Sequence, residues 1–263
     1  MDRVLPFIQR SKSADRPFLS VIWFHTPHLP CVAGPEYAKM YAKYSLQERN
    51  YYGCISAMDE QVGRLVQFLK QEGMYENTIL CFCSDNGPEV KTPGTAGKLR
   101  GKKRDLYEGG IRVPSFVVWS GKVPANKRTD HIAGTVDYLP SFVDLLSLQK
   151  SPYELDGESL KGFFMDNEAR QKPMVFAVPN PNRGAVIEQQ YKLFCEKGKY
   201  ELYDIQKDPN ETTDLSAKYP KILKRLRKIL DEKMESCRQS YEGAEYGTAS
   251  RKRVHINWID IQK

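Results

Sequence analysis

The sequence feature that most constrains the fold is a short apolar run that ends in residues with strong site chemistry. Residues 78–83 read Thr-Ile-Leu-Cys-Phe-Cys, and Asp85-Asn86-Gly87 follows them closely. A buried strand that ends in a carboxylate, an amide and a glycine places oxygen donors where open α/β sheets bind ligands. Such donors suit Ca²⁺ or Mg²⁺ rather than the metals that prefer thiolate or imidazole. Because Asp-Asn-Gly is also an ordinary turn, the tripeptide alone does not establish a metal site.

A second apolar run, farther upstream, leads into a loop with two histidines. Residues 17–24 are rich in β-branched and aromatic side chains, which predicts a buried strand. His25 and His28 follow it, and Pro27 and Pro30 stiffen their loop. A stiff loop at a strand end is a good mount for a general acid or for an imidazole that faces sulfate or phosphate. The alternative is that both histidines only hydrogen bond to backbone.

A cationic loop forms the third candidate segment. Gly109-Gly110 allows the backbone to approach its neighbours closely, and residues 114–119 predict another buried strand. A cationic loop beside a metal site neutralises the charge that develops when an anionic ester loses its leaving group. The alternative is a solvated basic loop. Four cations fall within five residues of this loop: Arg100, Lys102, Lys103 and Arg104.

Together these segments resemble the sulfatases, a family of the alkaline-phosphatase-like superfamily. Residues 27–30 read Pro-His-Leu-Pro, which is similar to the family's His-x-Pro loop. Residues 84–87 resemble its second metal-binding strand end. Residues 103–114 resemble its Lys-x-x-x-Tyr-Glu-Gly-Gly-Ile-Arg-x-Pro segment. The three motifs stand in the family's order across roughly residues 17–147.

The resemblance implies a role for each matching residue. Asp85 and Asn86 would be Ca²⁺ ligands, and His28 would contact the sulfate or the leaving oxygen. Lys103 would bind a sulfate oxygen, and it is preferred to Lys102 because it stands five residues before Glu108, as the family lysine does. His25 is a further substrate-binding candidate. The expected partner is a sulfated small molecule or carbohydrate.

One departure from the family pattern matters for catalysis. The family's nucleophile is a formylglycine made within a Cys-x-Pro-x-Arg or Ser-x-Pro-x-Arg signature, and this sequence contains no such signature. The strand end with the family's paired metal aspartates is also absent. The chain therefore resembles the C-terminal half of a sulfatase. Since Ca²⁺ takes roughly six to eight oxygen ligands, we expect this chain alone to bind Ca²⁺ weakly and to hydrolyse no sulfate ester at a useful rate.

Two other functions stay open. The chain could be a catalytically silent sulfatase remnant that acts as a binding or regulatory protein. It could also belong to a related hydrolase of phosphate or phosphonate esters. A phosphodiesterase or phosphomutase of the superfamily would carry Asp-His-Gly at this strand end, since imidazole suits Zn²⁺ or Mn²⁺, and Asn86 argues against that.

Composition fits part of a larger enzyme. The chain has 263 residues with 40% hydrophobic residues, which is ample for a core, and no apolar stretch approaches the roughly 20 residues of a membrane span. The first residues lack the long apolar segment of a secretory signal, although sulfatases usually enter the secretory path, the lysosome or the periplasm. Six cysteines impose no disulfide framework on a chain of this length, and Cys81 and Cys83 are predicted to be packed thiols.

The alternation of strands and helices predicts an α/β fold. Residues 1–149 are expected to form part of an alkaline-phosphatase-like domain, a parallel sheet sandwiched by helices. Residues 150–263 are expected to form a smaller subdomain, a small antiparallel sheet with one helix. A capping box at Ser45 and Glu48 predicts a helix that Gly73 ends, and residues 137–148 predict another. The expected strands of the subdomain are residues 174–178, 184–189 and 199–205; a further apolar stretch covers residues 254–261.

The net charge of +7 is concentrated near the C-terminal end of the chain. Apolar residues between Ile222 and Met234 recur at helical spacing among the cations of residues 218–233. This predicts an amphipathic helix whose apolar face covers a sheet. Nucleic-acid or membrane binding is not favoured, because no aromatic residues are interleaved with the cations. The sequence leaves the oligomeric state undetermined.

Overall fold

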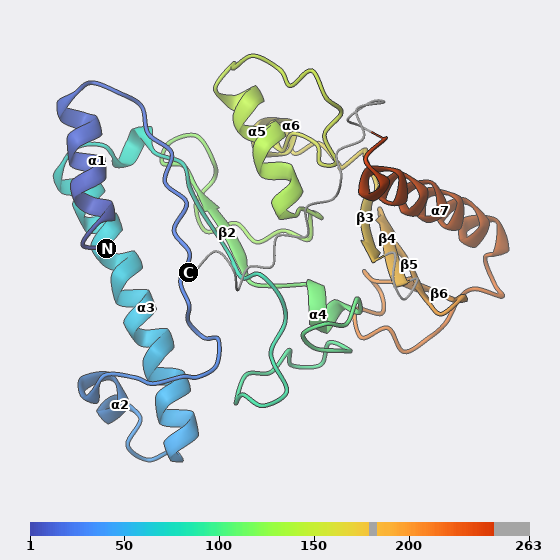
Figure 1. Ribbon diagram of the computed structural model, residues 1–263, viewed down its shortest axis with the longest axis horizontal. Coiled ribbons are helices and arrows are strands. Elements are labelled where there is room, and N and C mark those ends of the chain that lie inside the picture. The colour runs from blue at the N-terminus through green and yellow to red at the C-terminus, as the bar shows by residue number, and fades with distance from the viewer. Residues whose placement is uncertain (179–182, 245–263) are drawn as a thin grey trace. The chain divides into compact units, whose positions relative to one another are not determined.

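The computed structural model describes residues 1–178 and 183–244 (Figure 1). The chain divides into two compact units. The first unit comprises Met1–Asp105 and Gly109–Thr129, and the second comprises Leu106–Glu108 and Asp130–Lys263. A tripeptide from the middle of the chain therefore belongs to the second unit. The predicted domain boundary after residue 149 stays a prediction.

Three helices begin the first unit: α1 (Val4–Ser13), α2 (Pro35–Met40) and α3 (Leu46–Gln71). The predicted capping box opens α3, because the Ser45 hydroxyl accepts from the Glu48 amide while the Glu48 carboxylate accepts from the Ser45 amide. Gly73 follows the helix with a positive φ, as predicted. Ile8 of α1 packs on Leu65 and Leu69 of α3, and these three buried residues form the core of the first unit.

Two strands of the first unit confirm the predicted elements but not their direction. The 3-10 turn η1 (Tyr75–Asn77) leads into β1 (Leu80–Cys83), and β2 (Ser115–Val118) pairs with β1. The pairing is antiparallel, so the expected parallel sheet is wrong for these two strands. The rings of Phe82 and Phe116, directly opposite each other, stack with centroids 5.1 Å apart.

The predicted strand at residues 17–24 is not a strand among the described residues. The segment is extended, and its side chains alternate between half-buried and exposed. Phe18 and Ile22 pack against the α1–α3 core. The strand prediction was wrong because a strand also needs a hydrogen-bonded neighbour, and no described residue supplies one.

Short helices precede the sheet of the second unit. The one-turn helix α4 (Glu108–Ile111) starts at the last residue of the inserted tripeptide. The 3-10 turn η2 (Thr135–Asp137), α5 (Tyr138–Leu145) and α6 (Lys161–Asp166) follow. The helix predicted for residues 137–148 is confirmed, three residues shorter at its end.

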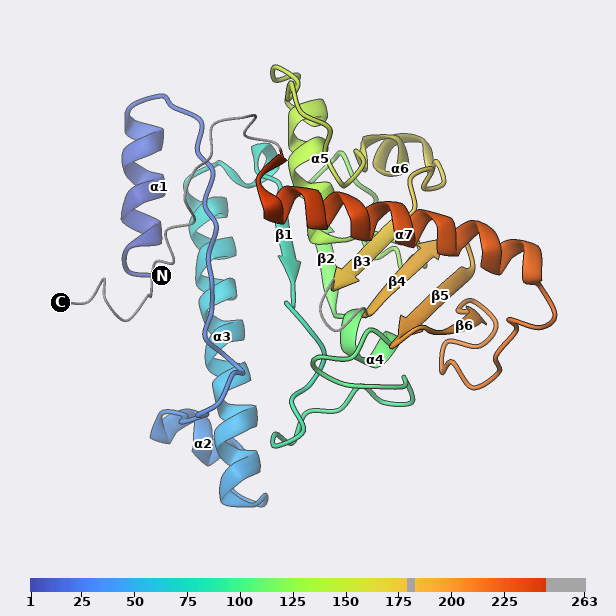
Figure 2. The ribbon, with the colours of Figure 1, turned by 45° about the vertical axis from the view of Figure 1, so that its right-hand side comes forward.

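The sheet of the second unit has four antiparallel strands in the order β3-β4-β5-β6. They are β3 (Met174–Val178), β4 (Arg183–Glu188), β5 (Tyr191–Glu196) and β6 (Lys199–Asp204). Three of the four match predicted strands, whereas β5 was missed. The helix α7 (Pro220–Glu242) lies across the sheet in Figure 2, as the amphipathic pattern predicted.

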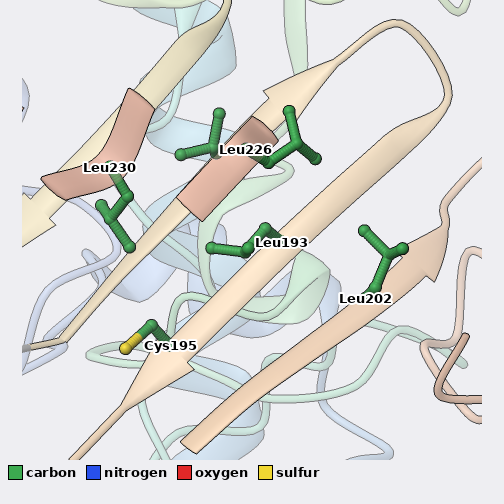
Figure 3. Close-up of a cluster of buried hydrophobic side chains, with 6 residues drawn as sticks. Leu193, Cys195, Leu202, Leu226 and Leu230 are labelled. Carbon is green, nitrogen blue, oxygen red and sulfur yellow. The ribbon is translucent and has the colours of Figure 1, made fainter. Parts of the chain in front are cut away.

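A dense apolar cluster joins α7 to this sheet. Leu226 and Leu230 of α7 are buried against Leu193, Cys195 and Leu202 of the strands, as Figure 3 shows. Val186 completes the buried cluster. Because every member is almost fully buried, the second unit has a complete core on this side of its sheet.

The other side of the sheet carries a polar network built around the inserted tripeptide. The Tyr107 ring stacks on Phe194 with centroids 4.1 Å apart, and its hydroxyl donates to Glu201 at 2.8 Å. The Lys192 ammonium lies 3.0 Å from a Glu108 oxygen and 2.8 Å from a Glu211 oxygen. Since all three charged side chains are buried, the lysine compensates two carboxylates away from water.

Two further sequence expectations concern the whole chain. All six cysteines are free thiols, which confirms that no disulfide framework exists. Among the described helices, none is long and apolar enough to cross a membrane. The apolar stretch at residues 254–261 lies outside the described residues.

Candidate functional site

The candidate metal ligands lie directly beyond β1. Ser84 donates its amide to the Pro114 carbonyl, and the chain then turns through Asp85 and Asn86. The Gly87 amide donates to the Gly110 carbonyl at 2.8 Å. A Cβ on Gly87 would overlap the Gly109 carbonyl oxygen, so only glycine allows this close approach.

The Gly109-Gly110 pair also allows the cationic loop to pack closely beside the Asp85-Asn86 turn. The Gly109 amide donates to the Arg100 carbonyl at 2.6 Å, and a Cβ on Gly109 would overlap two backbone oxygens of that loop. A Cβ on Gly110 would overlap the Asp105 carbonyl oxygen. Close backbone contacts therefore hold the loop of residues 100–105 next to the Asp85-Asn86 turn.

Lys103 is placed differently from its cationic neighbours. Its amide donates to the carbonyl of Pro88 at 3.0 Å, and Pro88 stands three residues after Asp85. Its ammonium group makes no hydrogen bond or ion pair with a described residue. Arg104 instead pairs with Glu89 at 2.8 Å, and its hydrogen bond lowers the pKa of that carboxyl. Lys102 is exposed, so Lys103 is the half-buried cation that the loop leaves unpaired.

The side chains of Asp85 and Asn86 also have no hydrogen-bond or ion-pair partner among the described residues. Their oxygens are available to a hard cation, and a carboxylate with an amide suits Ca²⁺. The two side chains can supply only about three of the roughly six to eight oxygens that Ca²⁺ needs. Within the described residues, no cluster of three or more acidic, histidine or cysteine side chains adds to them. The donor set fits part of a Ca²⁺ shell.

His28 and His25 lie together in their loop, with ring centroids 5.3 Å apart. The Nδ1 atom of His28 lies 2.7 Å from the Leu29 carbonyl oxygen. Because a carbonyl only accepts, Nδ1 carries the proton and Nε2 is left to exchange protons with a ligand. Among the described residues, no hydrogen bond or ion pair joins either histidine to Asp85, Asn86 or Lys103. Their site roles stay predictions.

Sequence reasoning missed the polar network of Glu108, Lys192 and Glu211. Glu108 stands inside the segment that resembles the sulfatase motif, but its partners are 84 and 103 residues farther along the chain. Burial is the largest influence on Glu211 and raises the pKa of its carboxyl, while Lys192 opposes that shift. The one local signal was a lysine between apolar residues in Tyr191–Glu196.

Comparison with known proteins identifies the family of this chain. The family model described as Sulfatase matches residues 1–148, more than half of the chain. The chain belongs to the sulfatase family. A second model, described as N-sulphoglucosamine sulphohydrolase, C-terminal, matches residues 101–240.

Two bacterial relatives illustrate the match. An uncharacterized sulfatase of Escherichia coli strain K12 is 34% identical over 173 residues, which cover 64% of this chain and 30% of the relative. A sulfatase of Formosa agariphila is 31% identical over 252 residues, which cover 83% of this chain and 45% of the relative. The sulfatase chain spans less than half of either relative.

Solved structures show the same fold. The crystal structure of Ps i-CgsB is 26% identical with a TM-score of 0.83, and the match covers 89% of this chain and 53% of that one. The same protein has been solved in complex with k-i-k-neocarrahexaose. BT4656, in complex with its substrate D-Glucosamine-2-N, 6-O-disulfate, is 25% identical with a TM-score of 0.57, covering 71% of this chain and 40% of that one. The alkaline-phosphatase-like mixed α/β fold class is confirmed.

Proposed function

We propose that this chain carries the Asp85-Asn86, His28 and Lys103 portion of a sulfatase site that hydrolyses sulfate esters of carbohydrates. The observation that carries the proposal is the backbone closure of the Lys103 loop on the Asp85-Asn86 turn, with all three side chains left unpaired. Polar side chains without partners on two adjacent backbone segments suit an anionic ligand and a cation.

Each side chain has a defined task in this proposal. Asp85 and Asn86 hold Ca²⁺, which supplies positive charge next to the sulfate when it is bound. The Lys103 ammonium binds a sulfate oxygen and orients the ester. His28 gives a proton to the leaving oxygen from Nε2, the nitrogen that the Leu29 carbonyl does not use.

Carbohydrate is the favoured substrate class because of the relatives. Two solved relatives are complexes with sugars, and one of those sugars is a disulfate described as the protein's substrate. A hydrolase of phosphate or phosphonate esters remains the alternative reaction, since sulfate and phosphate differ little in shape. A catalytically silent chain that only binds is the alternative outside enzymes.

The chain alone is proposed to be nearly inactive. It lacks the nucleophile signature, and electrostatic and positional effects alone leave catalysis far below that of an intact site. We expect a dissociation constant for Ca²⁺ above about 10⁻³ M by calorimetric titration, weaker than ordinary Ca²⁺ modules. Asp85→Asn should remove the remaining heat of binding, whereas Asp59→Asn, at an exposed acid of α3, should leave it unchanged.

A chimera tests the reaction. This chain replaces the matched 45% of the Formosa agariphila sulfatase, and turnover of a chromogenic aryl sulfate is measured. We expect turnover that falls at least about 100-fold in Lys103→Ala and His28→Ala, as for loss of charge stabilisation or of a general acid. Lys102→Ala is the matched control and should lose little. Turnover of an aryl phosphonate but not of the sulfate would favour the alternative hydrolase, and an inert chimera would favour the silent chain.

A further inference from the structure

The first half of α7 carries most of the chain's excess positive charge. Residues 215–230 contain six lysines and arginines and no acidic residue, whereas the whole chain has 40 lysines and arginines against 33 acids. The acids of α7 all stand after residue 230, so its first half is basic throughout. The six cations are Lys218, Lys221, Lys224, Arg225, Arg227 and Lys228.

This arrangement of charge does not serve the stability of the helix. Cations near a helix N-terminus interact unfavourably with the helix dipole, and the first turn of α7 has no acid to offset them. Like charges three or four residues apart repel one another, and Lys224 stands at such a spacing from both Lys221 and Lys228. A segment that breaks a local rule of stability without a compensating contact points to a function.

The packing of α7 on its sheet does not need these cations either. Leu226 and Leu230 cover the sheet from the inner face of α7, which lies across the strands (Figure 2). Lys224 and Lys228 each stand two residues from Leu226, about 200° around the helix, so they lie on the outer face. Both lysines are exposed, as is Lys221. We call these three residues, Lys221, Lys224 and Lys228, the lysine row.

The charges of the lysine row are available to a ligand. Lys221 and Lys224 make no hydrogen bond or ion pair with a described residue. The Lys228 ammonium lies 3.7 Å from a Glu232 oxygen, and the two side chains are 78% and 66% exposed. An exposed pair of this kind contributes little free energy, so an anion can replace it.

We propose that the lysine row is a binding surface for a sulfated polysaccharide, made of other residues than the candidate site. The row spans about 10 Å along the helix axis, because each residue rises about 1.5 Å, so it suits a polymer with repeated charges rather than a single anion. A polymer held there has a raised local concentration at the protein. The choice of sulfate esters rests on the proposed function.

Two other polyanionic partners fit the row less well. Proteins that bind single-stranded nucleic acid use aromatic side chains on which bases stack, and residues 220–230 contain none. A helix that lies on a membrane inserts an apolar face, and the apolar face of α7 is packed on the sheet. A sulfated polysaccharide needs only spaced cations, which the row offers.

The experiment measures binding of the full chain to three probes by surface plasmon resonance. The probes are oligosaccharides of ι-carrageenan, which are sulfated, oligosaccharides of agarose, which are not, and a DNA duplex. The test variant is Lys221→Gln/Lys224→Gln. The matched control, Lys199→Gln/Lys207→Gln, removes the same charge from side chains of the same unit that are 79% and 86% exposed. Lys221→Arg/Lys224→Arg keeps the charge, and circular dichroism checks the fold of each variant.

The expected result is binding of ι-carrageenan that weakens as salt is added, with weaker binding of agarose and of DNA. Lys221→Gln/Lys224→Gln should lower the affinity for ι-carrageenan at least about tenfold at low salt, as for the loss of two ion contacts to a polyanion. The affinity of this variant should also depend less steeply on salt. The control pair and the arginine pair should each change affinity less than about threefold, since neither removes a contact of the row.

Several results would overturn the inference. Equal loss of affinity in the two glutamine pairs would do so, because net charge alone would then explain binding. So would no binding of ι-carrageenan, equal affinity for agarose, or tighter binding of DNA, which would assign the row to nucleic acid. Binding through the row by a chain whose chimera does not hydrolyse the aryl sulfate would leave this surface intact and contradict the proposed function. An active chimera that does not bind ι-carrageenan through the row would do the reverse.

Discussion

The two units of this chain differ in how completely they bury their apolar side chains. The second unit packs α7 on one side of its sheet and the tripeptide Leu106–Glu108 on the other, so both faces are covered. The first unit packs residues 17–24 on α1 and α3 and leaves the opposite face exposed. The unit that holds the candidate site is thus the one with the smaller core. The difference teaches that, among the described residues, the larger core and the candidate site belong to different units.

The largest effect is expected from the buried lysine of the second unit. Lys192→Met leaves Glu108 and Glu211 buried without their cation, which should cost about 3–5 kcal/mol in the free energy of unfolding. Urea unfolding followed by circular dichroism measures the change. Lys199→Met is the control, because the Lys199 side chain is 79% exposed beside Glu201, and it should cost no more than about 1 kcal/mol. Equal losses of stability in the two variants would contradict the role of Lys192 as the cation that compensates the two buried carboxylates.

A pair of truncations compares the two apolar surfaces directly. Leu230→Ala opens a cavity in the core of the second unit and should cost about 2–5 kcal/mol. Trp23→Ala removes a larger side chain from the first unit but should change stability by no more than about 0.5 kcal/mol, because that side chain is mostly in water. The same unfolding measurement serves both variants. A large loss of stability in Trp23→Ala would show that this side chain is covered in the free chain.

The close backbone contacts at the candidate site predict a smaller loss. Gly87→Ala forces its new Cβ onto the Gly109 carbonyl oxygen, which should cost about 1–3 kcal/mol and weaken the calorimetric Ca²⁺ response. Gly63→Ala on α3 is the matched control, since nothing lies near its Cβ, and it should raise stability by roughly 0.5–1 kcal/mol. If Gly87→Ala were as stable as Gly63→Ala, the backbone closure would be disproved.

The smallest expected effect concerns the thiols of β1. Burial raises the pKa of Cys81 to about 11, so roughly one thiol in a thousand is ionised at pH 8. Alkylation by iodoacetamide, mapped by mass spectrometry, should rise about tenfold per pH unit until pH about 11. Because the folded pKa lies above that of the unfolded chain, stability should also fall as pH rises from about 9 to about 11. A rate that levels off near pH 9 would contradict the burial of Cys81, and Cys81→Ala identifies its peptide.

Sequence patterns correctly predicted the helices and strands that are determined by residues close together in the sequence. The Ser45–Glu48 capping box, the run that became β1 and the amphipathic stripe of α7 each determine their own structure through neighbouring residues. Residues 17–24 did not form the predicted strand, because pairing depends on residues elsewhere. β5 was missed because Lys192 breaks an otherwise continuous apolar run, and distant carboxylates make the burial of this lysine possible.

The same distinction applies to the candidate site. The glycines at 87, 109 and 110 marked a close approach that the structure contains, so the proximity of Lys103 to the Asp85-Asn86 turn could be anticipated. The place of His28 relative to that turn could not, since a loop has no periodic pattern that fixes its position. The roles of all four side chains stay predictions that the chimera and the titration address.

The insertion of Leu106–Glu108 limits how the molecule can be dissected. A fragment that starts at residue 130 would contain the whole four-stranded sheet and α7 but would lose Tyr107 from the Phe194 ring and Glu108 from Lys192. No single cut in the chain yields the second unit with its native partners. A peptide that spans residues 106–108, added back to such a fragment, should therefore rescue part of its stability.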